Sequence, residues 1–230
     1  MSLGIFIQVR LGSTRLPGKA LLPLPGGSVI QHVMRAMARV PADVRALVTE
    51  QRSAALLAPA ALQEGFLLFV GPEDDVLARY CMACRKYHVD TALRATGDNP
   101  LTSAALARSI LVLHEKSGSD LSHYLGIPLG SGVEIVRSES LFIAEKEARD
   151  PAEKEHVTSF FYRNRQRFRI LEADAPSECE LPEARVTIDT QEDYERVMRI
   201  FNDLHTGEPI ETSQVVSWFR TRAMTHRENE

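Results

Sequence analysis

The sequence lacks any apolar run close to the roughly 18 residues needed to cross a bilayer, so we expect no membrane protein. No basic leader precedes the first apolar run, GIFIQV, and we therefore expect a cytoplasmic location. Only three cysteines occur in 230 residues, too few for a disulfide framework. Cys81 and Cys84 form a CxxC pair within a helical pattern, with no second pair of metal ligands nearby. We expect them to be buried helix cysteines rather than a metal or redox site.

Acidic residues are missing from the first 42 positions, although the whole chain has 31 acidic and 27 basic residues and a net charge of −4. The basic residues in this acid-free stretch are Arg10, Arg15, Lys19, Arg35 and Arg39. The net negative charge argues against a general nucleic-acid binder. The local positive field instead predicts a small anionic ligand.

Apolar residues alternate between strand-like runs and helical spacing along most of the chain. The expected strands are 4–9, 44–49, 66–70, 91–96, 121–124, 133–136, 168–172 and 185–188. The expected helices are 29–40, 53–64, 74–88, 103–114, 139–149, 154–163, 191–204 and 213–222, the third with Asp74 as its N-cap. Four early strands separated by helices predict an α/β fold with a largely parallel, doubly wound sheet. The length of the chain predicts one domain over 1–230, with an inserted subregion at about 120–180.

Three expected strand ends carry polar residues, and ligands of open α/β sheets bind beyond the carboxyl ends of strands. These segments are residues 10–19, 96–100 and 189–193. The first has the composition of a phosphate-binding loop, with two glycines, two hydroxyl groups and three positive charges. It is neither a Walker loop nor a GxGxxG motif, because Ala20 stands where a Walker loop has Ser or Thr. A solvated basic turn is the alternative interpretation.

The string RLGSTRLPGKAL at residues 10–21 resembles the signature of the sugar cytidylyltransferases of the CMP-sialic acid and CMP-KDO synthetase type. It resembles the spore-coat polysaccharide (SpsF-like) branch more closely. Other family landmarks follow in the same order: GPEDDVLARY at 71–80, RATGDNPL at 94–101, GVEI at 132–135, EHVT at 155–158 and RVTIDTQEDY at 185–194.

This resemblance implies a three-layer αβα sandwich of the Rossmann-like, nucleotide-diphospho-sugar transferase type, with a mostly parallel mixed sheet. It also implies transfer of CMP from CTP to a sugar or sugar-acid acceptor, with pyrophosphate as the leaving group. Such a reaction serves the synthesis of polysaccharide or glycoconjugate precursors. Family members further suggest a homodimer held together by the second-half subregion.

The same resemblance implies roles for particular residues. The catalytic set is Arg15, Lys19, Asp98 and Asp189, in which the two basic residues hold phosphates and the two aspartates hold Mg²⁺. The remaining phosphate ligands are Arg10, Gly12, Ser13 and Thr14. Without the resemblance, each aspartate has an alternative, purely structural role. Asp98 can be a simple turn former, and Asp189 can be a helix N-cap with Glu192 as its capping-box partner.

Base and acceptor contacts are less specific. Asp75, Arg79 and Arg94 are the candidates for base or ribose contacts, and the alternative for Arg79 is an ion pair with Asp75 across one helical turn. The candidates for acceptor binding are Glu134, Glu155 and His156, in which His156 assists deprotonation of the attacking oxygen. The alternative is a helix-end salt bridge and a histidine satisfied within the protein.

The chain departs from the SpsF-like pattern in the segment PLGSGVE, where that branch commonly reads PDGLDVE. Leu129 and Gly132 therefore replace two expected aspartates, which predicts either a different acceptor or weakened activity. One alternative function is thus a catalytically impaired nucleotide-binding paralogue. The other is a GT-A-type glycosyltransferase, although Gly97-Asp98-Asn99 lacks the second acid of the Asp-x-Asp motif that such enzymes usually carry.

Overall fold

The computed structural model describes residues 2–227 and contains one large sheet and one two-stranded ribbon. The strands are β1 (Leu3–Gln8), β2 (Pro23–Leu24), β3 (Gly27–Ser28), β4 (Val44–Thr49), β5 (Leu67–Val70), β6 (Thr91–Thr96), β7 (Leu121–Leu125), β8 (Glu134–Arg137) and β9 (Ile170–Asp174). The large sheet has the order β5-β4-β1-β6-β8-β7-β9. Its first four strands are parallel, β8 runs antiparallel to both neighbours, and β9 is parallel to β7. The predicted mostly parallel, mixed α/β sheet is confirmed.

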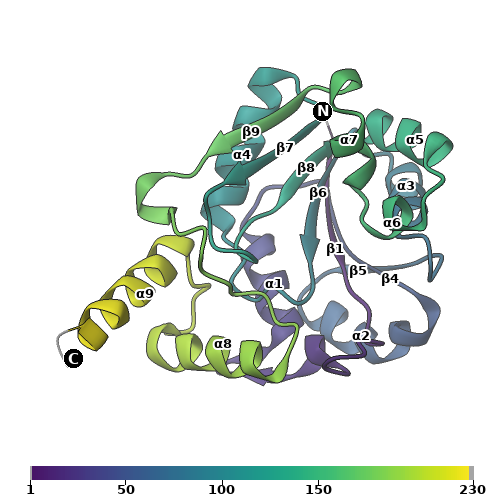
Figure 1. Cartoon of the computed structure of the whole chain (residues 1–230). Coiled ribbons are helices and arrows are strands. Elements are labelled where there is room, and N and C mark those ends of the chain that lie inside the picture. The colour runs from purple at the N-terminus through teal and green to yellow at the C-terminus, as the bar shows by residue number, and fades with distance from the viewer. Residues whose placement is uncertain (1, 228–230) are drawn as a thin grey trace.

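Helices cover both faces of this sheet and complete the three layers (Figure 1). They are α1 (Val29–Ala38), α2 (Gln51–Gln63), α3 (Val76–Tyr87), α4 (Ala104–Ser117), α5 (Ser138–Glu147), α6 (Pro151–Glu155), α7 (Ser159–Arg163), α8 (Gln191–Leu204) and α9 (Thr212–Arg227). Residues of α1, α2 and α4 share one buried cluster with Ile5 and Ile7 of β1. Those of α3, α5 and α7 share another with Phe6. This alternation along β1 follows from the two-residue period of a strand.

A third buried cluster joins α8 and α9 to the end of the sheet that carries the polar loops. Val186 and Ile188, which precede Asp189 in the chain, pack there against Val197, Ile200 and Phe201 of α8. Figure 1 shows α8 and α9 together, apart from the helices that cover the two faces of the sheet. Packing of α8 therefore places the 184–189 segment at the rim of the sheet.

Several local predictions were wrong. Residues 185–188 form no strand: within residues 2–227 their β-pairing is limited to one isolated bridge, from Leu129 to Arg185. The helix expected at 154–163 is divided into α6 and α7, with His156 as the C-cap of α6. The N-cap of α3 is Asp75 rather than Asp74, and its side chain accepts from the backbone N–H of Ala78 at 2.8 Å. Asp74 and Asp75 are both of a residue type that caps helices, so the capping signal was present but lay one residue further along the chain.

The prediction that Cys81 and Cys84 are buried helix cysteines is confirmed. Cys81 and Cys84 lie in α3 within the core, and Cys179 is also buried and unpaired. Burial raises the pKa of the Cys84 thiol to about 11 and that of Cys81 still further. Among the described residues no three His, Cys, Asp or Glu side chains group into a metal site. No helix in this same part of the chain is both long and apolar enough to span a bilayer.

Candidate active site

Hydrogen bonds fix the conformation of the loop after β1, and this loop places Lys19 at the carboxyl end of the sheet. The backbone N–H of Gly18 donates to the carbonyl of Leu11 at 3.1 Å, and the N–H of Leu11 donates to Ser53 Oγ at 2.9 Å. Gly18 has a φ of 68°, a left-handed conformation that favours glycine, and it directly precedes the short 3₁₀ turn Lys19–Leu21. The loop therefore projects Lys19 across the carboxyl ends of β1 and β6.

Asp98 and Asp189 come from distant parts of the chain but share one backbone contact. The N–H of Gly97 donates to the carbonyl of Gln8 at 2.8 Å, which continues the β1–β6 pairing past the end of β6. The N–H of Ile188 donates to the carbonyl of Asp98 at 3.0 Å. This bond links the two loops directly and places both carboxylates at the same edge of the sheet, as the predicted site requires.

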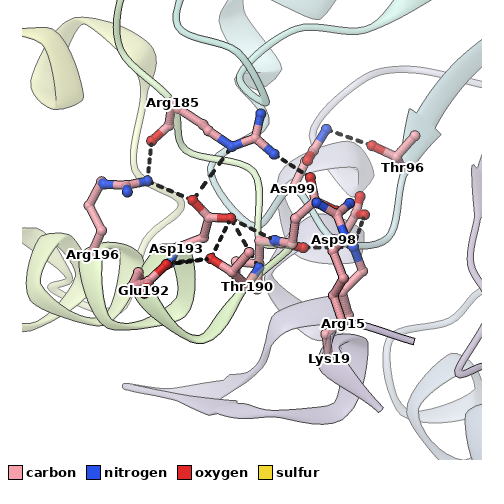
Figure 2. Close-up of polar contacts among 12 residues, drawn as sticks. Arg15, Lys19, Thr96, Asp98, Asn99, Arg185, Thr190, Glu192, Asp193 and Arg196 are labelled. Carbon is pink, nitrogen blue, oxygen red and sulfur yellow. Dashed lines mark hydrogen bonds and ion pairs between the residues drawn. The ribbon is translucent and has the colours of Figure 1, made fainter. Parts of the chain in front are cut away.

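Lys19 Nζ joins the carboxylates of Asp98 and Asp189, and Figure 2 shows Lys19 beside Asp98 and Arg15. It lies 2.6 Å from Asp98 Oδ2 and 2.8 Å from Asp189 Oδ1, and Arg15 Nη2 lies 3.1 Å from the same oxygen of Asp189. Burial raises the pKa of Asp189, but the hydrogen bond and charge of Lys19, with the charges of Arg15 and Arg185, outweigh burial and lower that pKa below its usual value. Asp189 is therefore held ionised by three basic side chains.

Three further residues support Asp189, and the sequence did not identify them. Arg185 hydrogen-bonds to Asp189 Oδ2, and its Nε lies 3.5 Å from Asp193 Oδ1. Asp193 Oδ2 also accepts from the backbone N–H groups of Asp189 and Thr190, at 3.1 and 3.0 Å. Arg196 Nη1 donates to Asp193 Oδ1 at 2.8 Å. Asp193 is thus buried, fully partnered and bonded to the backbone that carries Asp189 (Figure 2).

The helix start at 189–193 differs from the expected one. Thr190, not Asp189, is the N-cap of α8, and the capping-box partner is Asp193 rather than Glu192. A threonine followed three residues later by an acid is itself a capping signal, and it is visible in the sequence as T-Q-E-D. Since Thr190 caps the helix, the side chain of Asp189 points away from the helix start and toward Lys19.

Gly130 holds the 184–189 segment close to the loop between β7 and β8. Its φ is +101°, and an added Cβ would lie 2.5 Å from Thr187 N and 2.9 Å from Thr187 Cα. We expect Gly130→Ala to lower the free energy of unfolding by about 3 kcal/mol, because the contact is with backbone atoms and the φ is unfavourable for alanine.

Urea denaturation of Gly130→Ala measures this loss. The matched control is Gly12→Ala, which adds the same methyl group where no other heavy atom lies within 4 Å. The control is expected to change the free energy of unfolding by less than about 0.5 kcal/mol. Equal stability of the two variants would show that the close approach of Gly130 to Thr187 is unimportant.

A cavity of about 470 Å³ lies over these residues. Its lining includes eleven of the predicted site residues: Arg10, Gly12, Ser13, Thr14, Arg15, Lys19, Arg79, Asp98, Glu155, His156 and Asp189. Arg10 Nη2 lies 3.1 Å from Glu155 Oε1, so an ion pair joins the phosphate-type loop to the end of α6. The cavity thus brings the predicted phosphate, metal and acceptor residues together.

Asp75, Arg94 and Glu134 are outside the lining of the cavity. Asp75 caps α3 and its Oδ2 lies 3.4 Å from Lys154 Nζ, and Arg94 Nη1 is paired with Glu134 Oε2 at 2.6 Å. Their roles in binding base or acceptor stay predictions.

Arg79 lines the cavity, although its side chain is only 2% exposed. It donates from Nε to the carbonyl of Pro72 at 2.9 Å and from Nη2 to that of Glu73 at 3.0 Å. The alternative interpretation, an ion pair between Arg79 and Asp75, is wrong, because the guanidinium group donates to these carbonyl oxygens instead. Arg79 therefore shapes the 71–75 loop beside the cavity.

Known proteins resemble this chain over nearly its full length. A family model described as Cytidylyltransferase matches residues 5–215. The spore coat polysaccharide biosynthesis protein SpsF of Bacillus subtilis (strain 168) is 31% identical over 231 residues, 96% of each chain. A solved cytidylyltransferase structure from Leptospira borgpetersenii serovar Hardjo-bovis (strain JB197) matches with a TM-score of 0.89 and 25% identity, covering 97% of this chain and 96% of that one. CMP:2-keto-3-deoxy-manno-octonic acid synthetase, solved in complex with CTP, shares the fold with a TM-score of 0.69 and 17% identity, covering 88% and 99%.

Proposed function

Since this chain belongs to the cytidylyltransferase family of nucleotidyltransferases, we propose that it transfers CMP from CTP to an oxygen of a sugar or sugar-acid acceptor and releases pyrophosphate. The observation that carries this proposal is the convergence of Asp98 and Asp189 on Lys19, beside an acid-free loop that lines the same cavity. The B. subtilis relative is named for spore-coat polysaccharide biosynthesis. We therefore place the reaction in the synthesis of polysaccharide or glycoconjugate precursors.

The loop after β1 supplies the groups for the triphosphate. Arg10 and Arg15 are 58% and 62% exposed, so both side chains are accessible to an anion in the cavity. Gly12, Ser13 and Thr14 add backbone N–H groups and hydroxyl groups along the same wall. Positive groups fixed in advance around the leaving pyrophosphate favour its departure, because negative charge develops there during the reaction.

The donor set suits Mg²⁺. Asp98 and Asp189 offer carboxylate oxygens, which hard divalent cations prefer, and both lie within hydrogen-bond distance of one Lys19 nitrogen. Two protein carboxylates leave room for phosphate oxygens and water, as is usual for Mg²⁺ at a nucleotide site. Asp98 and Asp189 would hold the ion, which would supply positive charge to the phosphate oxygens. Arg185 and Asp193 hold Asp189 in position for this role.

The acceptor oxygen attacks the α-phosphorus of CTP, and the bond to the β-phosphate oxygen breaks to release pyrophosphate. We assign the acceptor side of the cavity to Glu155 and His156 at the end of α6. His156 is exposed and accepts the proton of the attacking hydroxyl group. We also propose that residues 1–230 act as one unit in the cytoplasm. The subregion at about 120–180 then contributes to the acceptor site and to a homodimer contact.

Thermal-shift measurements with the four nucleoside triphosphates and Mg²⁺ test the nucleotide assignment. CTP is expected to raise the melting temperature most, since a ligand at a hundred times its Kd stabilises the folded state by about 2.7 kcal/mol. Pyrophosphate release from CTP, screened over sugars and sugar acids, then identifies the acceptor. A shift with another nucleotide alone, or with none of the four, would contradict the proposal.

A further inference from the structure

The ammonium group of Lys19 has all three of its N–H donors directed at acceptors of the protein. Nζ lies 2.6 Å from Asp98 Oδ2, 2.7 Å from the backbone carbonyl oxygen of Ile188 and 2.8 Å from Asp189 Oδ1. The side chain is 11% exposed, against 62% for Arg15 in the same loop. Lys19 is thus enclosed by acceptors, whereas Arg15 is an exposed side chain that reaches the Asp189 carboxylate.

Basic side chains engage three of the four carboxylate oxygens in the pair Asp98 and Asp189. Lys19 takes one oxygen of each aspartate, Arg15 shares Asp189 Oδ1, and Arg185 takes Asp189 Oδ2. These are the oxygens that a divalent cation needs. The ammonium group and a cation on the same two oxygens repel each other strongly at this separation, because the site is shielded from water.

We propose that Lys19 is an internal counter-ion that competes with the divalent cation for Asp98 and Asp189, and that the triphosphate removes this competition by drawing Lys19 onto its phosphate oxygens. The inference rests on the proposed function for the identity of the nucleotide and of the metal. It makes metal binding to the protein alone weak and couples it positively to nucleotide binding. Such coupling is reciprocal, so the metal strengthens nucleotide binding by the same factor.

The variant Lys19→Met separates this role from simple phosphate binding. In the absence of nucleotide, competition predicts a higher metal affinity for the variant, whereas simple phosphate binding predicts no gain in metal affinity. Methionine is unbranched like lysine, is one heavy atom shorter and carries no charge. In the absence of nucleotide, we expect the variant to bind Mn²⁺ about ten-fold more tightly than the wild-type chain, since both carboxylates lose their shared cation. Electron paramagnetic resonance titration of free Mn²⁺ measures this affinity directly. The same variant should show a smaller thermal shift with CTP. Unchanged or weaker Mn²⁺ binding by Lys19→Met would overturn the inference.

Two controls make the result specific. Lys154→Met changes the net charge equally and removes the partner of Asp75, which lies 3.4 Å from Lys154 Nζ. It is expected to leave Mn²⁺ affinity unchanged. The double variant Lys19→Met/Asp189→Asn should lose the gain in affinity, because one of the two carboxylates is gone. A gain that survives in this double variant would place the cation elsewhere and contradict the proposal.

A further variant covers the case in which Lys19→Met does not fold, as judged by circular dichroism. Arg15→Met removes an exposed cation from Asp189 Oδ1 and should raise Mn²⁺ affinity by about two- to three-fold. An unchanged affinity in this variant would count against competition. The wild-type thermal shift with CTP keeps the two hypotheses apart. If CTP stabilises the wild-type chain but no variant gains Mn²⁺ affinity, only the counter-ion role fails. If CTP does not bind, the proposed function fails.

Discussion

Replacing Asp98 with Asn is expected to lower kcat/KM for CMP transfer by about a hundred- to a thousand-fold, the scale of losing one preorganised electrostatic group. The amide keeps the size of the side chain and the turn at 97–99. It removes one of the two carboxylates that converge on Lys19. Asp98 Oδ2 lies 2.6 Å from Lys19 Nζ. Under the proposed function we therefore expect metal binding to weaken, and Lys19 keeps Asp189 as its remaining carboxylate partner.

The measurement for Asp98→Asn is pyrophosphate release with the acceptor that supports the fastest wild-type reaction. The variant should keep its thermal shift with CTP in the absence of metal, because Arg10 and Arg15 remain. The matched control is Asp203→Asn, the same change on α8, where Asp203 pairs with Trp218 Nε1 at 2.7 Å. That control should retain wild-type kinetics. If Asp98→Asn retained wild-type activity, the role of Asp98 would be limited to forming the turn.

Replacing Glu134 with Ala is expected to lower the free energy of unfolding by about 3–5 kcal/mol, because it leaves a shielded arginine without its counter-charge. Arg94 Nη1 lies 2.6 Å from Glu134 Oε2, and both side chains are only 17% exposed. Thr158 Oγ1 and Tyr162 OH donate to the same carboxylate at 3.1 Å. Burial raises the pKa of Tyr162, and the charge of Glu134 raises it further, so the phenol stays a donor.

Urea denaturation with an unchanged m-value measures the loss in Glu134→Ala. Glu134→Gln keeps an acceptor for Thr158 and Tyr162 and should lose about half as much stability. Glu139→Ala, at an exposed position in the first turn of α5, should cost less than about 0.5 kcal/mol. If Glu134→Ala were stable and raised only the KM for the acceptor, Glu134 would bind the acceptor directly, as the resemblance implies.

The departure at Leu129 is compatible with a folded and active chain. Leu129 is 56% exposed, and its backbone bonds to Ala184 and Val186 in the segment that leads to Asp189. The aspartate common in the SpsF-like branch is therefore not needed to hold this segment in place. Both aspartates at the cavity, Asp98 and Asp189, are present. Under the proposed function we accordingly expect the change at Leu129 to affect which acceptor binds rather than the proposed phosphate and metal end of the site.

The sequence by itself determined the features that depend on near neighbours in the chain. The apolar run at residues 4–9 predicts a strand, and β1 (Leu3–Gln8) is found there. The helix expected at 191–204 has the same bounds in the structure, because its apolar period and its polar start are local signals. The acid-free start of the chain likewise predicts an anion-binding loop, since composition is a property of the sequence alone.

Only the tertiary structure decided which side chains meet. Three donors of Lys19 find partners 79, 169 and 170 residues away, and no periodicity encodes such distances along the chain. The same is true of Glu134, whose shielded partners come from β6 and α7 and leave it outside the cavity. Residues 185–188 have the composition of a strand, yet they pair through one bridge because packing against α8 places them at the rim. The preferences of neighbouring residues determine the helices and strands. Long-range packing and charge pairing determine the side-chain contacts, because they join atoms that only folding brings together.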